Sequence, residues 1–167
     1  MKSNLLIIKS GIKGLKVFQS TVFEDCRGEI WTSWEKNFFK INFNHDKFTL
    51  SKKNVLRGFH GDDKTWKLIS CVYGSFYFVV VDYNYKSKNF LKSYNFTLSC
   101  KNKLQVLVPP KFLNAHLCIS KQCIFHYKLS YSVNYNDFDQ QHSVKWNDPR
   151  LRIKWPIKNP ILSKRDS

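Results

Sequence analysis

A chain of 167 residues is long enough to bury a core within one domain, so neither disulfides nor a structural metal are required for stability. Its formal net charge of +16 would attract polyanions, but the lysines are spread along the chain in runs no longer than two, and no nucleic-acid motif is present. The five cysteines are odd in number and contain no Cys-x-x-Cys pair, which argues against a disulfide framework or a zinc ribbon.

No segment has the features of an export signal or a membrane helix. The apolar stretch at residues 5–8 is too short for a signal peptide and is interrupted by Lys9. No later apolar run approaches the roughly 20 residues that a membrane helix needs. We therefore expect a cytoplasmic protein with one domain over residues 1–167, and neither nucleic acid nor membrane among its partners.

Aromatic and β-branched segments alternate with clusters of Asn, Asp, Gly, Lys and Ser, without sustained helical periodicity. This pattern predicts a nearly all-β sandwich or barrel, for which a jelly roll is one option, with one short helix at residues 34–39. The expected strands cover residues 15–21, 28–33, 47–51, 54–60, 65–73, 75–82, 93–98, 105–108, 115–120, 123–129 and 143–146.

Two of these strands carry specific expectations. Residues 75–82 are apolar on both faces, which predicts a central strand. At 123–129 the side chains of Phe125, Tyr127 and Leu129 share one face. Tyr127 therefore points inward among apolar neighbours, where its hydroxyl needs a partner.

Residues 55–67 place an arginine, a histidine, a carboxylate and a lysine beside apolar side chains. Burying such groups without partners costs several kcal/mol, so they mark either a paired structural network or a site, and we favour a site. On a regular strand Arg57 and His60 would face opposite sides, because their separation is odd. We therefore predict a bulge at Gly58, or the end of the strand there.

The C-terminal tail, from residue 147 onward, is an extended segment punctuated by prolines. We expect Trp146 and Trp155 to hold it against the barrel. A carboxylate one residue from the end, Asp166, would by default be disordered.

Short motifs follow one another in a fixed order from about residue 22 to residue 166. They are Asp25-Cys26-Arg27-Gly28, VLRGFH at 55–60, Lys67-Leu68, Gly74 with 79–82, Val108-Pro109 with Phe112, Phe125-His126-Tyr127-Lys128, WNDP at 146–149, Trp155-Pro156 and LSKRD at 162–166. Together they resemble the nucleotide-sugar 3,5-epimerases of the cupin fold, typified by dTDP-4-dehydrorhamnose 3,5-epimerase. The resemblance implies a cupin-type jelly roll with short peripheral helices, a homodimer in which an N-terminal strand can be exchanged, and no cofactor or metal.

The resemblance also implies a catalytic set. His60, which ends the L-R-G-x-H motif, corresponds to the base, and Asp166 of the terminal L-S-x-x-D to its orienting carboxylate. Tyr127 corresponds to the general acid, and Lys67 lies near the 4-keto oxygen of the sugar. Four further positions match substrate-binding positions of the family, namely Arg57, Arg27, Glu29 and Asp82.

The chemistry of such a reaction suits these residue types. A 4-keto group acidifies the hydrogens on C3 and C5, so inversion needs a base on one face, an acid on the other and a cation for the enolate. An imidazole with a carboxylate partner can serve as the base near neutral pH. A lysine or arginine stabilises the oxyanion, which is often among the largest contributions to catalysis.

Some positions depart from the family pattern. Family members acting on thymidine nucleotides have Gln-x-Asn where this chain has His45 and Lys47, and His-Gly-Phe where it has Asn114-Ala115-His116. With HGD-x-x-TWKL and PPKF-x-NAHL, these residues resemble the subgroup acting on GDP-4-keto-heptoses in bacterial capsule biosynthesis. They predict a GDP-linked 4-keto heptose as substrate, with His45, Lys47, Asn114 and His116 among its ligands.

Other functions stay open at this point. A dTDP-4-keto-6-deoxyglucose 3,5-epimerase and a sugar-nucleotide 3,4-ketoisomerase would use the same fold. A metal-dependent cupin oxygenase would use His60, Asp62 and His116 as a two-His-one-carboxylate triad. A non-catalytic binder of sugar nucleotides or polyanions would need none of these residues as a base.

Overall fold

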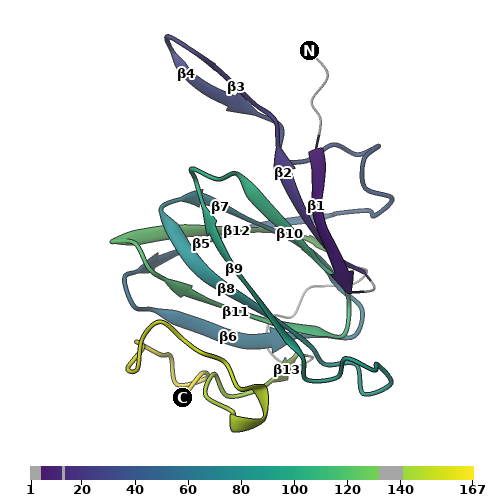
Figure 1. Cartoon of the computed structure of the whole chain (residues 1–167), viewed down its shortest axis with the longest axis vertical. Helices are drawn as coiled ribbons and strands as arrows, with labels where there is room; N and C mark the ends of the chain where they lie inside the picture. Colours follow the sequence, from purple (N-terminus) through teal and green to yellow (C-terminus); the bar gives the residue numbers. More distant parts are fainter. Residues whose placement is uncertain (1–4, 13, 132–140) are drawn as a thin grey trace.

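The computed structural model describes residues 5–12, 14–131 and 141–167, and its regular structure is almost entirely β-strand (Figure 1). No described helix is long and apolar enough to cross a membrane. The elements in chain order are β1 (Leu5–Ile12), β2 (Leu15–Ser20), β3 (Val22–Asp25), β4 (Gly28–Trp31), β5 (His45–Lys52), β6 (Leu56–Gly61), β7 (Trp66–Tyr73), β8 (Ser75–Asp82), β9 (Ser93–Ser99), β10 (Leu104–Val108), β11 (Phe112–Cys118), β12 (Gln122–Ser130), β13 (His142–Ser143) and the 3-10 helix η1 (Pro149–Leu151).

Two antiparallel sheets pack face to face. One has six strands in the order β1-β2-β10-β7-β12-β5, and the other has five in the order β13-β6-β11-β8-β9. Strands β3 and β4 form a separate hairpin that projects away from this body (Figure 1). The arrangement is the cupin-type jelly roll that the resemblance implies, but the only helical element among the described residues is η1, in place of the expected short peripheral helices.

Ten of the eleven predicted strands are confirmed with ends displaced by a few residues, whereas the strand predicted at 143–146 meets β13 only at Ser143, and β1 and β3 were not predicted. The helix expected at residues 34–39 is wrong, because the chain there forms bends and turns. Aromatic packing explains the difference. The rings of Phe38 and Phe39 both meet Phe18 edge to face, at centroid distances of 5.6 and 5.1 Å, so neighbouring residues turn toward the same ring instead of following a helical stripe.

Strand β8 is central, as its apolar sequence predicts. Phe76, Phe78 and Val80 belong to the core between the two sheets. Val79 and Val81 face the other side, where they join a second apolar cluster with Leu151 of the C-terminal segment. The five-stranded sheet is therefore covered on both faces, which is why this strand has no polar face.

The C-terminal tail packs on the outer face of the five-stranded sheet. Trp155 donates a hydrogen bond from Nε1 to the carbonyl of Trp146 at 2.9 Å. Its ring lies 5.9 Å from that of Phe59 and 5.8 Å from that of Tyr77. Trp155 therefore holds the tail against the sheet, as predicted, whereas Trp146 packs on Trp155 within the tail at a centroid distance of 6.4 Å. Further along, the N–H of Ile161 donates a hydrogen bond to the carbonyl of Asn54 at 2.8 Å, just before β6 begins. This contact brings the last residues of the chain to β6.

The irregularity predicted at Gly58 is present in β6. Asn114 of β11 is opposite His60, and His116 is opposite Arg57, so β6 has two residues between its paired positions where β11 has one. Gly58 takes a φ of 116°. The extra residue shifts the alternation of side chains along the strand by one position. Arg57 and His60 therefore face the same cavity although their separation is odd.

We expect Gly58→Ala to be strongly destabilising. A Cβ on Gly58 would lie 2.5 Å from the carbonyl oxygen of Asn114 and 2.7 Å from Cα of Ala115. Overpacking and left-handed strain, each about 1–3 kcal/mol, should together lower the free energy of unfolding by roughly 3 kcal/mol or more. Urea unfolding measures this loss.

Gly28→Ala is the matched control, because Gly28 also has a positive φ, of 121°, but no atom within 4 Å of the added Cβ. It should cost only the backbone strain, about 1–2 kcal/mol. Equal losses in the two variants would show that close packing at Gly58 is not what requires glycine.

Candidate active site

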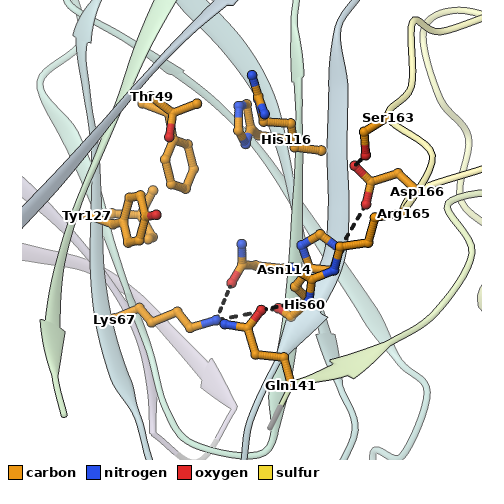
Figure 2. Close-up of a pocket in the computed structure, with 13 residues that line it drawn as sticks. Thr49, His60, Lys67, Asn114, His116, Tyr127, Gln141, Ser163, Arg165 and Asp166 are labelled. Carbon is orange, nitrogen blue, oxygen red and sulfur yellow. Dashed lines mark hydrogen bonds and ion pairs between the residues drawn. The ribbon is translucent and has the colours of Figure 1, made fainter. Parts of the chain in front are cut away.

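A cavity of about 270 Å³ opens between the two sheets and is closed on one side by the C-terminal tail (Figure 2). Both sheets contribute side chains to it. Successive residues of each strand point alternately to the interior and to the outside, so every second side chain can face the cavity. The lining residues are Thr49, Arg57, His60, Lys67, Ile69, Asn114, His116, Phe125, Tyr127, Gln141, Ser163, Arg165 and Asp166.

His60 and Asp166 form an ion-pair contact at one wall of this cavity. His60 Nε2 lies 2.8 Å from Asp166 Oδ1, and only 4% of the carboxylate side chain is exposed. Ser163 donates its hydroxyl to the other carboxylate oxygen at 2.9 Å. Residues from β6 and from the end of the chain thus meet, and the tail folds back as this pairing requires (Figure 2).

The surroundings of Asp166 favour its charged form. Burial is the largest single influence and raises the pKa of this carboxyl, but the hydrogen bond and charge of His60, the Ser163 hydroxyl and the backbone of Gly58 together outweigh it. The pKa therefore lies below the ordinary value of 3.8. An ionised carboxylate beside Nε2 fixes the tautomer of the ring, so Nδ1 is the nitrogen left to accept a proton.

Lys67 lies deep in the cavity, on the inward face of β7. It is 6% exposed, and its ammonium donates to Asn114 Oδ1 at 3.1 Å. A second contact, at 3.5 Å, joins it to the carbonyl of His60. These oxygens position a buried cation beside His60, where an ammonium can stabilise a developing oxyanion.

Tyr127 faces His60 across the cavity from the opposite sheet (Figure 2). It projects from β12 on the same side as Phe125, as its alternation predicts, and its ring lies 5.3 Å from that of Phe125. The two groups capable of proton transfer therefore approach a bound molecule from different sides.

Arg57 and His116 line the remaining wall. Arg57 Nε donates to the hydroxyl of Ser51 at 3.2 Å. Burial, and then the nearby Arg57 charge, lower the pKa of His116 to about 3. His116 is thus neutral at neutral pH and is poorly suited to act as a base, in contrast to His60 with its carboxylate partner.

His45 and Lys47 lie on β5, close to the cavity but not in its lining. The register places Lys47 directly opposite Tyr127. His45 contacts the side chain of Asn44 at 3.0 Å. Residues 45, 47 and 49 share one face of β5, and Thr49 lines the cavity. His45 and Lys47 therefore continue the same row of side chains outward from the lining.

Three predicted ligands do not lie in this cavity. Asp82 accepts hydrogen bonds from the backbone of Asn84 and the hydroxyl of Ser87, so it stabilises the loop after β8. Arg27 and Glu29 belong to the projecting hairpin, where Arg27 pairs with Asp25 at 2.6 Å and Glu29 with Lys103 at 2.6 Å. A sequence motif cannot reveal that a hairpin points away from the sheets.

The metal triad is not assembled. The Oδ1 atom of Asp62 accepts hydrogen bonds from the backbone N–H groups of Lys64 and Thr65, at 2.9 and 2.7 Å, which commits it to the turn. Within residues 5–12, 14–131 and 141–167, no three His, Cys, Asp or Glu side chains are grouped so as to hold a metal ion.

Four polar lining residues had no assigned role in the sequence: Thr49, Gln141, Ser163 and Arg165. Thr49 follows Lys47 by two positions, so strand alternation could have found it. Ser163 and Arg165 lie within the LSKRD motif itself. Gln141 accepts a hydrogen bond from Arg165 at 3.0 Å, and no sequence pattern indicated it.

A family model described as dTDP-4-dehydrorhamnose 3,5-epimerase matches residues 9–167. The chain belongs to this family. Membership confirms the enzyme class that the motifs predict, a sugar-nucleotide epimerase, and it agrees with the jelly-roll fold.

Individual relatives cover almost the whole chain. A dTDP-4-dehydrorhamnose 3,5-epimerase of Shigella flexneri is 32% identical over 96% of this chain and 92% of its own length. The solved enzyme of Bacillus anthracis has a TM-score of 0.92 at 29% identity, covering 98% and 97% of the two chains. The solved dTDP-6-deoxy-D-glucose-3,5-epimerase of Legionella pneumophila has a TM-score of 0.89 at 29% identity, covering 98% of this chain and 90% of its own. None of these names supports the predicted GDP-heptose subgroup.

Asp166→Asn should make stability less dependent on pH. The folded-state pKa of Asp166 lies below its ordinary value of 3.8. The ionised carboxylate therefore stabilises the fold at pH values above 3.8, and this contribution is lost as the pH falls through the folded-state pKa. The variant should be about 1–3 kcal/mol less stable at pH 6, with a smaller deficit at pH 3. Urea unfolding at both pH values measures the deficit, and a constant or growing deficit would contradict the pairing.

Proposed function

We propose that this protein inverts C3, or C3 and C5, of a nucleotide-linked 4-keto sugar by acid–base chemistry through an enolate, without a cofactor. The observation that carries the proposal is the His60–Asp166 pair facing Tyr127 across a cavity that also holds the ammonium of Lys67. One wall can take a proton and the opposite wall can return one.

The steps follow from the positions of these groups. His60 takes the proton on C3 or C5 at Nδ1, while Asp166 stabilises the imidazolium that forms. The electrons of the broken C–H bond move to the 4-keto oxygen, and Lys67, which is held by Asn114, stabilises the enolate charge. Tyr127 then protonates the same carbon from the other face, which inverts it.

For the sugar nucleotide, we infer a dTDP-linked 4-keto-6-deoxy sugar as the first candidate. The Legionella pneumophila enzyme was solved with dTDP-4-keto-L-rhamnose, and that of Bacillus anthracis with TDP and PPi. A GDP-linked 4-keto heptose is the second candidate, and the polar residues at positions 45, 47, 114 and 116 favour it. Comparing kcat/KM for the two nucleotides distinguishes them.

The roles of base and acid can be separated by substitution. His60→Ala should lower kcat by about 10² or more, because general-base catalysis is lost. Tyr127→Phe should still release the substrate proton to solvent but should form the inverted product far more slowly. Proton NMR of a 4-keto sugar nucleotide measures both, since exchange removes a signal and inversion changes couplings.

His142→Phe is the control for these variants, because His142 of β13 does not line the cavity and contacts Asp63 at 3.0 Å. It should leave turnover near that of the unsubstituted protein. Near-normal turnover in His60→Ala would remove His60 from the mechanism, and unchanged inversion in Tyr127→Phe would remove the tyrosine.

We also propose a homodimer. The outward face of the six-stranded sheet exposes Phe48 at 63%, Leu50 at 58% and Val72 at 43%, and the projecting hairpin exposes Ile30 at 71%. An apolar surface of this kind on a soluble chain marks an association site. A second copy could also bring its Arg27 and Glu29 to this cavity, which explains why two family site positions lie outside it here.

Mixing two inactive variants tests that arrangement. Arg27→Ala and His60→Ala should each lose activity alone. If Arg27 acts in the site of the other copy, co-expressed variants should recover up to about a quarter of normal activity, because half of the dimers are mixed and each has one intact site. No recovery, in dimers shown by light scattering to be mixed, would place Arg27 outside the partner's site.

A further inference from the structure

His116 is a buried polar residue for which the proposed proton transfers have no use. It is 4% exposed, and its ring stacks on that of Phe125 at a centroid distance of 4.2 Å and an angle of 15°. The ring of Phe76 lies 5.5 Å away. Aromatic packing therefore fixes the plane of the imidazole, so its nitrogens have a set direction in the lining of the cavity.

The Nε2 atom of His116 is buried and has no hydrogen-bond partner among the described residues. Buried polar atoms in folded proteins are nearly always paired, and an orphaned one destabilises the fold. Phenylalanine would fill the same space and keep the stacking without this penalty. A bound molecule in the cavity that His116 lines could supply a partner for this nitrogen.

The chemistry of His116 defines the group that it can bind. The ring is neutral, since burial and Arg57 hold its pKa at about 3, so it has one N–H donor and one nitrogen acceptor. A neutral donor–acceptor suits a hydroxyl group, which can both accept and donate, better than it suits a phosphate. In the proposed mechanism Lys67, held by Asn114, faces the keto oxygen, and His116 lies two residues beyond Asn114 on the same face of β11.

We propose that His116 is a specificity-determining residue whose Nε2 hydrogen-bonds a hydroxyl group of the sugar, so that the site selects sugars hydroxylated at that position. This inference rests on the proposed function, because it takes a sugar as the occupant of the cavity. Two hydroxyls could supply this chemistry, the one on C2 and one on the side chain beyond C5.

Binding of unreactive sugar nucleotides tests the proposal and locates the hydroxyl. The probes are dTDP-glucose, dTDP-6-deoxyglucose and dTDP-2-deoxyglucose, or GDP-mannose with its 6-deoxy and 2-deoxy forms if guanine is preferred. One deoxy probe should bind the unsubstituted protein about 10-fold more weakly than its parent, the effect of one lost buried hydrogen bond. His116→Phe should bind that probe and its parent equally.

Thermal unfolding of the unliganded variants provides a second readout. His116→Phe should raise Tm, because it removes an orphaned nitrogen and keeps the stacking. His126→Phe is the matched control, because His126 has partners in Ser70 and Asp46. It should lower Tm and leave the discrimination between probes intact.

Several results would overturn the proposal. They are equal binding of all three probes, discrimination that survives in His116→Phe, or a lowered Tm in that variant. Absence of binding by every probe would overturn both this inference and the proposed function. If discrimination is present but 4-keto sugars are not turned over, only the proposed reaction fails.

Discussion

The contact between His60 and Asp166 is the interaction on which the rest of the site depends. It joins β6 of the five-stranded sheet to Asp166 near the end of the chain, and it orients the histidine that we propose as the base. Two structural features make it possible. The extra residue at Gly58 turns His60 and Arg57 toward one cavity, and the packing of Trp155 and Leu151 on the sheet carries the tail to the edge of β6.

The cavity is a polar interior built into an apolar sandwich, and its polar groups hold one another in place. Lys67 is paired with Asn114, Arg57 with Ser51, and Asp166 with Ser163 as well as His60. Lys67 and Asp166 are buried and would be costly to bury singly, so their contacts let the fold keep charge between its sheets, whereas Arg57 is exposed. Among the described residues, the buried Nε2 of His116 has no hydrogen-bond partner, so this side chain is informative about the group that binds there.

The sequence predicted those features that depend on local periodicity. The two apolar faces of residues 75–82, the inward direction of Tyr127 and the irregularity at Gly58 all follow from the alternation of strands. Long-range placement is not encoded in this way. Alternation could not show that the hairpin carrying Arg27 projects from the body, or that Asp82 is used by its own loop. The turns at residues 34–39 result from contacts with Phe18, distant in sequence, which no local pattern reveals.

The central claim is that the cavity removes a proton from a carbon next to a 4-keto group, and proton NMR in D2O tests it most directly. The dTDP- and GDP-linked 4-keto sugars are each incubated with the protein. The account predicts that deuterium enters C3, or C3 and C5, of at least one of them, together with inversion at the same carbon. No exchange into any of these substrates, in a folded sample, would contradict it.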